Sequence, residues 1–285
     1  MSGQINQPTR EAREDFRASA RNENFPVALR LLPRSHRSHL MALYRYARRV
    51  DDAGDTAWGD RSRLLDALEA QLDEVFAGGR PTDPAVAGLA PTIRVHRLRR
   101  EPFAALLDAN RRDQHVTRYR TFEELLDYCS LSANPVGELV LGVFDSITER
   151  NRYYSDNVCS ALQILEHCQD VAEDHASGRV YLPAEDMAFF GVTEHELTAG
   201  AASRQLRALI GYQVQRAVAM LDEGSELLRG LRGLARVAIA GYIGGGLATA
   251  EALAQAHFDV LATTPKPHGV TTMRESVRLL AGAMR

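Results

Sequence analysis

The sequence predicts an all-α protein, because apolar residues recur with the helical period and no segment alternates apolar and polar residues as a strand would. Apolar side chains at 64–76 follow an i, i+4, i+8 pattern, and Gly78 and Gly79 then end the predicted helix. Longer segments of the same kind span about 203–228 and 231–261. No repeat of 20–50 residues is present, which argues against a solenoid.

Helix-start signals support this fold class. Thr121 with Glu124, and Thr193 with Glu196, have the spacing of a capping box, in which each side chain bonds the other residue's backbone N–H. Proline at 183 and glycine at 191 predict a short helix between them, since proline favours the first helical turn and glycine the residue after the last.

Composition bounds the domain organisation and the partners. The chain has 285 residues, 45% hydrophobic and 25% charged, which is enough apolar material for one large core. The polar joints are short, so we expect one domain over 1–285, loosely ordered at about 1–20 and after 265. A net charge of only −3 argues against a nucleic-acid partner.

The cysteines and the hydropathy pattern indicate a location. Cys129, Cys159 and Cys168 are an odd number without metal-ligand spacing, which favours a reducing cytoplasm. Residues 1–25 are polar and lack the apolar core of a signal peptide. No run of about 18 apolar residues is evident, so a membrane-spanning helix is not expected. The amphipathic end at 271–285 is expected to dock on the protein body, with peripheral contact at the inner face of a membrane as the alternative.

A first acidic motif, DDAGD, ends a predicted helix that begins near Pro33. Its polar residues share a sector of about 100° on an ideal helix; they are Tyr44, Arg48, Asp51, Asp52 and Asp55. Carboxylates near a helix C-terminus repel one another and oppose the helix dipole, so they favour a bound cation. Mg²⁺ is a cation that binds through one or two carboxylates together with water and phosphate oxygens. By itself the motif could also be a solvated acidic turn.

A second acidic segment, SALQILEHCQDVAED, makes the cation interpretation stronger. Its polar residues again fall within about 100° on a continuous helix; they are Gln163, Glu166, His167, Asp170 and Asp174. The other side is apolar and suited to packing. Two carboxylate ladders about 120 residues apart suit helices that face each other across a diphosphate site, where Mg²⁺ bridges phosphate oxygens.

Other features have simpler readings. Gly244–Gly246 lacks the lysine of a phosphate loop and is interpreted as close helix packing. His115, with the neighbouring Arg111 and Arg112, could touch a diphosphate or end a solvated helix. Phe189 and its neighbour Phe190 are interpreted as packing residues.

The blocks ALYRYARRVDDAGD, YCSLSANPVGEL and LQILEHCQDVAEDHASGRVYLP occur in an order and spacing that resemble the squalene/phytoene synthase family of head-to-head prenyl synthases. The resemblance extends from about Glu23 to Leu261, and the SANPVG block is similar to the bacterial hydroxysqualene synthase branch. It implies an isoprenoid-synthase helical bundle with a central cavity.

The resemblance also implies residue roles. The metal ligands would be Asp51, Asp52, Asp55, Glu166, Asp170 and Asp174, with Mg²⁺ as the cofactor. Catalytic groups at the diphosphate would be Tyr44, Arg48, Arg179 and Tyr181. Residues near the substrate would be Asn24, Phe25, Tyr128, Val136, Gly137 and Gln163. Glu166 departs from the family, which usually has Asn there, and adds a negative charge.

The implied reaction is ionisation of presqualene diphosphate, rearrangement of the carbocation and capture of one water to give hydroxysqualene. A presqualene diphosphate synthase and a hydroxysqualene reductase would then be functional partners. The alternatives are a squalene, dehydrosqualene or phytoene synthase that condenses two prenyl diphosphates such as farnesyl diphosphate, and an inactive family member that serves as an assembly protein. A lipid-binding carrier would not need the two carboxylate ladders.

Overall fold

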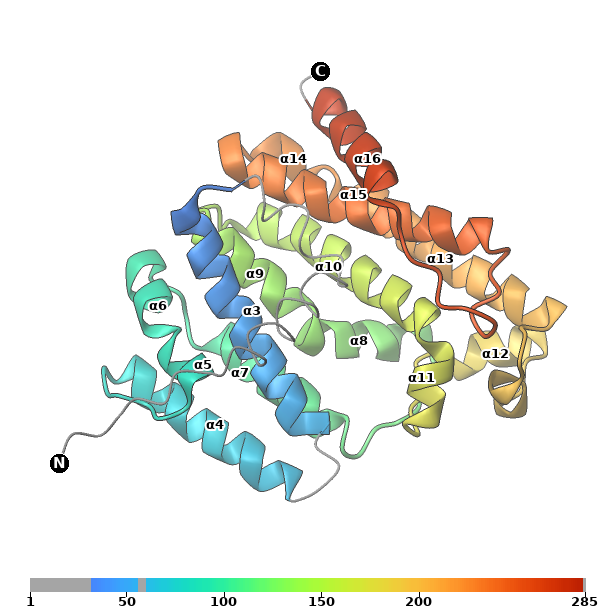
Figure 1. The fold of residues 1–285 in the computed structure, drawn as a ribbon, viewed down its shortest axis with the longest axis horizontal. Coiled ribbons are helices and arrows are strands. Elements are labelled where there is room, and N and C mark those ends of the chain that lie inside the picture. The colour runs from blue at the N-terminus through green and yellow to red at the C-terminus, as the bar shows by residue number, and fades with distance from the viewer. Residues whose placement is uncertain (1–31, 56–59, 284–285) are drawn as a thin grey trace.

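The computed structural model describes residues 32–55 and 60–283, and this part of the chain is helical (Figure 1). The first helices are α3 (Arg34–Asp55), α4 (Arg61–Phe76), α5 (Pro84–Ala87), α6 (Ala90–His96), α7 (Glu101–Arg112), α8 (Phe122–Ser132) and α9 (Asn134–Val143). They are followed by α10 (Glu149–Gln169), α11 (Val171–Ala176), α12 (Ala184–Phe190), the 3₁₀ turn η1 (Glu194–Thr198), α13 (Arg204–Gly224), α14 (Leu227–Gly230), α15 (Gly233–Gln255) and α16 (Gly269–Gly282). Within the described ranges, the recorded β pairing is a single bridge between Arg118 and Val180. The all-α prediction is confirmed.

Helix α10 runs through the middle of the bundle (Figure 1). It packs against α8 and α9 on one side and against α13 and α15 on the other. Helix α3 lies beside α4, α7 and α9, so it borders the same interior from the N-terminal half. Tyr46 of α3, Phe103 of α7 and Ile164 of α10 are among the largest fully buried side chains. One continuous apolar core therefore joins the helices that carry the acidic motifs.

The helix-start signals mark real helix starts, although only one of the two predicted capping boxes is recorded as reciprocal: the Glu124 carboxylate accepts from the Arg120 backbone N–H at 2.8 Å. The Thr121 side chain accepts a hydrogen bond from the backbone N–H of Glu124 at 3.2 Å. Thr193 and Glu196 form the reciprocal capping box at the start of η1. Gly191 ends α12 with a φ of +68°, a left-handed conformation that glycine adopts without a steric penalty.

Two long segments differ from the sequence prediction. The segment predicted at 203–228 is divided into α13 and α14, and the next helix ends at Gln255 rather than near 261. Helix α15, which is interrupted by Arg236 and Glu251, is nevertheless long and apolar enough to cross a membrane by length and composition alone. Within the fold, 72% of its most apolar window is buried, as in a core helix of a soluble domain.

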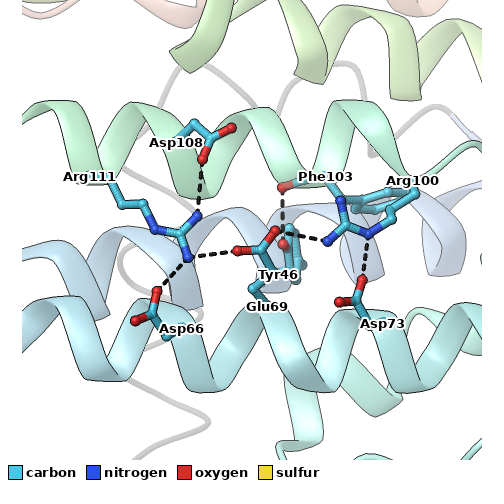
Figure 2. A network of polar contacts seen from close by, with 8 residues as sticks. All are labelled: Tyr46, Asp66, Glu69, Asp73, Arg100, Phe103, Asp108 and Arg111. Carbon is cyan, nitrogen blue, oxygen red and sulfur yellow. Dashed lines mark hydrogen bonds and ion pairs between the residues drawn. The ribbon is translucent and has the colours of Figure 1, made fainter.

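A polar network attaches α4 to α7 (Figure 2). The Arg111 guanidinium donates to Asp66 and to Glu69, both at 2.7 Å, and the Arg100 guanidinium donates to the other oxygen of Glu69 at 2.8 Å. Next to it, the buried Tyr46 hydroxyl of α3 donates to the Phe103 carbonyl of α7 at 3.0 Å. Arg111 therefore points toward α4, which disfavours, for this arginine, the alternative of a contact with a diphosphate.

Helix α16 docks on α15 through its more polar side. Thr272, Glu275 and Ser276 are the buried residues of α16, whereas Met273 and Val277 are 46% and 56% exposed. The amphipathic end does dock on the body, yet part of its apolar face points to solvent. Met284, which belongs to that face by sequence, lies outside the described residues. The side chain of Phe189 is 81% exposed, so its interpretation as a packing residue was wrong.

Gly244 sets the distance between these two helices. A Cβ at this position would lie 2.4 Å from Ser276 Oγ and 2.8 Å from the Ser276 backbone nitrogen. Because the second atom is backbone, the contact cannot be relieved by a rotamer change. The glycine run therefore allows close helix packing, as the sequence predicts.

We predict that Gly244→Ala lowers the free energy of unfolding by about 1–3 kcal/mol, because the added methyl group forces α16 away from α15. Thermal unfolding followed by circular dichroism measures the change. Gly282→Ala is the matched control in the same helix pair, since a Cβ there meets nothing within 4 Å. Equal melting temperatures for Gly244→Ala and wild type would contradict the packing role.

Candidate active site

A cavity of about 250 Å³ lies between the ends of α3 and α7 on one side and α8, α10 and α11 on the other. Most of its lining is polar, in contrast to the apolar core around it. The lining residues are Arg48, Asp51, Asp55, Leu106, Ala109, Asn110, Asp113, Tyr128, Ser132, Gln163, Glu166, His167, Asp170, Asp174, Arg179 and Tyr181. The two acidic motifs therefore meet at one site.

The structure places most of the predicted site residues at this cavity. Those that line it are Arg48, Asp51, Asp55, Tyr128, Gln163, Glu166, Asp170, Asp174, Arg179 and Tyr181. Tyr44, Asp52, Val136 and Gly137 are not part of the lining. Asn24 and Phe25 lie outside the described residues. The roles assigned to all of these residues remain predictions.

The residues that do not line the cavity have other surroundings. Asp52 is exposed and forms an i, i+4 ion pair with Arg48 at 3.1 Å. Gly137, on α9, lies against α10, and a Cβ there would come within 2.6 Å of both Ser155 Oγ and Cys159 Sγ. This glycine thus permits the close approach of α9 and α10.

The first acidic motif occupies the last turns of α3 and is linked to residues far along the chain. The Asn110 amide of α7 donates to Asp51 Oδ1 at 3.1 Å, and the Arg179 guanidinium donates to Asp55 Oδ1 at 2.9 Å. Although Asp51 keeps an exposed edge, the crowding of its carboxyl group by protein raises its pKa to about 6. The Asn110 hydrogen bond partly offsets this rise in pKa.

The second acidic motif is not one continuous helix. Helix α10 ends at Gln169, Asp170 has the non-helical angles φ −102° and ψ 17°, and α11 begins at Val171. The prediction of an unbroken carboxylate ladder was therefore wrong. Asp170 and Asp174 nevertheless line the same cavity. Burial, followed by the neighbouring Asp174 and Glu173 charges, raises the pKa of Asp170 to about 6.

A cluster of aromatic residues forms the wall between the two motifs. The Tyr181 ring stacks on His167 with 3.7 Å between ring centroids, and Tyr128 lies beside both rings. The Tyr128 hydroxyl donates to Asp113 Oδ2 at 2.7 Å, and the Tyr181 hydroxyl lies 3.4 Å from Asp113 Oδ1. Burial raises the pKa of Asp113. His167 also approaches Asp174, with 3.6 Å between Nδ1 and Oδ2.

Sequence analysis missed Asn110 and Asp113 as cavity residues. Both belong to the segment NRRDQH, which was considered only for its arginines and its histidine. On α7 the residues three apart share a face. The spacing of Asn110 and Asp113 was therefore an available signal, but only the packing of α7 against α3 shows which face meets the cavity.

The donor set suits a divalent oxygen-binding cation. Six carboxylic acids and two arginines line the cavity, and this excess of acids favours an added positive charge. Within the described residues, 32–55 and 60–283, no group of three His, Cys, Asp or Glu side chains forms a preformed metal-binding cage. Mg²⁺ usually binds to one or two carboxylates plus waters and substrate phosphates, so an open arrangement of this kind fits it.

We predict a pH-dependent stability from Asp51 and Asp170. Each carboxyl group has a pKa near 6 in the folded protein and about 3.9 in an unfolded chain. The folded state therefore holds extra protons between about pH 4 and 6, and its free energy of unfolding decreases as the pH rises through that range. In EDTA, the double variant Asp51→Asn/Asp170→Asn should gain stability relative to wild type between pH 4.5 and 7.5. A difference in melting temperature that stays constant with pH would contradict this assignment.

Comparison with known proteins places this site in a family. The family model for squalene/phytoene synthase matches residues 18–274. The hydroxysqualene synthase of Zymomonas mobilis is 34% identical over 208 residues, which are 72% of this chain and 69% of that protein. The phytoene synthase of Mycobacterium bovis is 32% identical over 230 residues, 79% of this chain and 74% of that protein.

Solved structures agree with this result. The squalene synthase of Alicyclobacillus acidocaldarius shares 38% sequence identity and a TM-score of 0.77, with 92% of this chain and 98% of that chain covered. A dehydrosqualene synthase solved with a ligand has the same fold at 24% identity, with a TM-score of 0.82 and 98% and 99% coverage. The match of both sequence and fold over most of the chain shows that it belongs to the squalene/phytoene synthase family, with the all-α isoprenoid-synthase fold.

Proposed function

We propose that this protein is a Mg²⁺-dependent enzyme that converts presqualene diphosphate and water into hydroxysqualene and diphosphate. The family acts on prenyl diphosphates, and the observation that carries the proposal is the meeting of both acidic motifs at one cavity bordered by arginines. Among the reactions of the family, the formation of hydroxysqualene is supported by the similarity to the hydroxysqualene synthases of Zymomonas mobilis and Sinorhizobium fredii, at 34% and 32% identity.

In this proposal, Asp51 and Asp55 on one side of the cavity and Asp170 and Asp174 on the other would hold Mg²⁺. The bound ion supplies positive charge that stabilises a departing diphosphate. Glu166 faces the same cavity and would add a further oxygen donor. Asp52 forms an ion pair with Arg48 and is not among the residues that line the cavity, so a role for it as a metal ligand has less support than for the other four aspartates.

Arg179 and Arg48 would bind diphosphate oxygens, a task for which the planar guanidinium offers several donors. Arg179 donates to Asp55 from one terminal nitrogen, while its Nε is buried without a hydrogen-bond partner. A buried unpaired donor is costly, so an anion that accepts from it would be stabilised. The Tyr181 and Tyr128 hydroxyls border the same space and are oriented by Asp113.

Carbocation chemistry requires that water reach the reacting carbon only at the end of the rearrangement. The buried apolar residues of α3, α8, α9 and α10 around the cavity would keep bulk water out. The oxygen of one water molecule then forms a bond to the cationic carbon, and loss of a proton from that oxygen gives the neutral alcohol. No nicotinamide-binding motif is evident in the sequence, and this favours quenching by water over reduction.

The second candidate is a synthase that condenses two prenyl diphosphates, such as farnesyl diphosphate, to squalene, dehydrosqualene or phytoene. Its support is the 32% identity to a phytoene synthase over 79% of the chain. An inactive assembly protein is less well supported, because Asp51 and Asp55 of the first motif, Asp170 and Asp174 of the second, and two arginines line the same cavity.

The proposal includes functional coupling to a presqualene diphosphate synthase and to a hydroxysqualene reductase, and a cytoplasmic location. Peripheral contact with a membrane would use the exposed side of α16, where Val270, Met273 and Val277 are among the exposed apolar residues.

We predict that Asp51→Asn, Asp55→Asn, Asp170→Asn and Asp174→Asn each lower kcat/KM by about 100-fold or more, since each removes a charged Mg²⁺ ligand. Steady-state assays with a titration of MgCl₂ measure the loss, and circular dichroism checks that helical content is kept. Asp222→Asn, on the exposed surface of α13, is the control. Full turnover of the wild-type enzyme in excess EDTA would contradict the metal requirement.

We predict that the pure protein converts presqualene diphosphate in ¹⁸O-labelled water into a C30 alcohol carrying one labelled oxygen, with or without NADPH. Mass spectrometry of the products measures this. Farnesyl diphosphate alone should yield little C30 product. Efficient formation of squalene or phytoene-like hydrocarbons from prenyl diphosphates would replace the first candidate function by the second.

A further inference from the structure

The end of α3 is held by a buried amide of α7. Asn110 is only 9% exposed, and its Nδ2 donates to Asp51 Oδ1 and to the Leu106 carbonyl of its own helix, both at 3.1 Å. Both hydrogens of this NH₂ group are therefore used. The bond to the helix backbone anchors the amide, so the bond to Asp51 holds that carboxylate in a defined orientation.

Gly54 makes this contact geometrically feasible. It lies one helical turn after Asp51 and is buried against α7, where a Cβ would come within 1.9 Å of Asn110 Oδ1. Any side chain at position 54 would displace the amide. Gln114, four residues after Asn110 and just past the end of α7, donates to the Gly54 carbonyl at 3.2 Å and to the Asn110 carbonyl at 2.9 Å. The glycine inside the DDAGD motif is thus matched to Asn110.

We propose that Asn110 is a positioning residue that orients Asp51 for cation binding, and that Gly54 is required so that the amide can reach it. This inference rests on the proposed function, in which Asp51 is a Mg²⁺ ligand. With Oδ1 held by Asn110, Oδ2 of Asp51 is the oxygen left to bind the cation. Hydrogen bonds of this kind to a metal ligand typically change metal affinity or activity by 10–100-fold.

The chain contains a matched pair of residues away from the cavity. Asn151, on α10, is also buried, and its Nδ2 donates to the Ser146 carbonyl at 2.8 Å. A Cβ on Gly230 would come within 2.7 Å of Asn151 Oδ1, as a Cβ on Gly54 would approach Asn110. Neither residue lines the cavity. Substitutions in this pair reproduce the loss of packing without touching an acidic motif.

The test is isothermal titration calorimetry of Mg²⁺ in the presence of inorganic pyrophosphate, on the full chain and without substrate. Asn110→Leu should weaken Mg²⁺ binding by about 10–100-fold, because the shape is nearly kept while the donor is lost. Asn151→Leu should lower the melting temperature but leave the Mg²⁺ affinity within about twofold of wild type, since its partner is a backbone carbonyl.

Substitution of Gly54 provides an independent test in the same titration. Gly54→Ala should weaken Mg²⁺ binding as Asn110→Leu does, and Gly230→Ala should not. In the Asn110→Ala background, Gly54→Ala should cost much less than in wild type, because no amide is left to displace. Such non-additivity identifies residues that act through a shared contact.

The outcomes separate this inference from the proposed function. If wild type binds Mg²⁺ with pyrophosphate and Asn110→Leu and Gly54→Ala bind it equally well, the positioning role is overturned and the metal site stands. If these variants and the Asn151 and Gly230 controls weaken binding alike, the effect is general destabilisation and the positioning role is again overturned. If wild type does not bind Mg²⁺ at all, the proposed metal site fails and the inference fails with it.

Discussion

The repulsion among the carboxylates at the cavity is the constraint on which the other features of the site depend. The first motif lies at the C-terminal end of α3, where the helix dipole also disfavours negative charge. The structure compensates locally through the Asn110 amide at Asp51 and the Arg179 guanidinium at Asp55. The ion pair of Arg179 with Asp55 joins residues 124 positions apart, so it also links the two halves of the site.

Helix α7 separates the structural and the functional polar groups. On one side, Arg100 and Arg111 bind the acidic residues of α4 (Figure 2) and fix the position of α7. On the other side, Asn110 and Asp113 reach the cavity and orient a carboxylate and two tyrosine hydroxyls. Because a helix is stiff, the ion pairs with α4 stabilise the position of the groups at the cavity. The α4–α7 network thus supports the site without lining it.

The apolar interior has a complementary role. Helix α10 contacts helices of both halves of the bundle, and the close approaches at Gly137 and Gly244 allow α9 to pack on α10 and α16 on α15. Close packing of this kind excludes water, and the proposed carbocation chemistry would need such exclusion. The family relationship and the chemistry of the cavity therefore agree with one another, although they derive from different observations: one from sequence similarity and the other from geometry.

The sequence by itself determined the helical class, the N-cap at Thr121, the capping box at Thr193, and the two acidic motifs. These features arise from local interactions between residues a few positions apart, and local spacing is what a sequence displays directly. The break at Asp170 lies within a segment whose periodicity is compatible with one helix, so sequence spacing alone could not reveal it.

Only the tertiary structure decided which residues of α7 join the site, that Asp52 does not line the cavity, and that Phe189 points to solvent. Each of these outcomes depends on how one helix packs against another. Asn110 and Asp51 are 59 residues apart and Arg179 and Asp55 are 124 residues apart, and no local pattern relates such positions. The physical reason is that a helix presents several faces of similar polarity, and the choice among them is made when the whole core is packed.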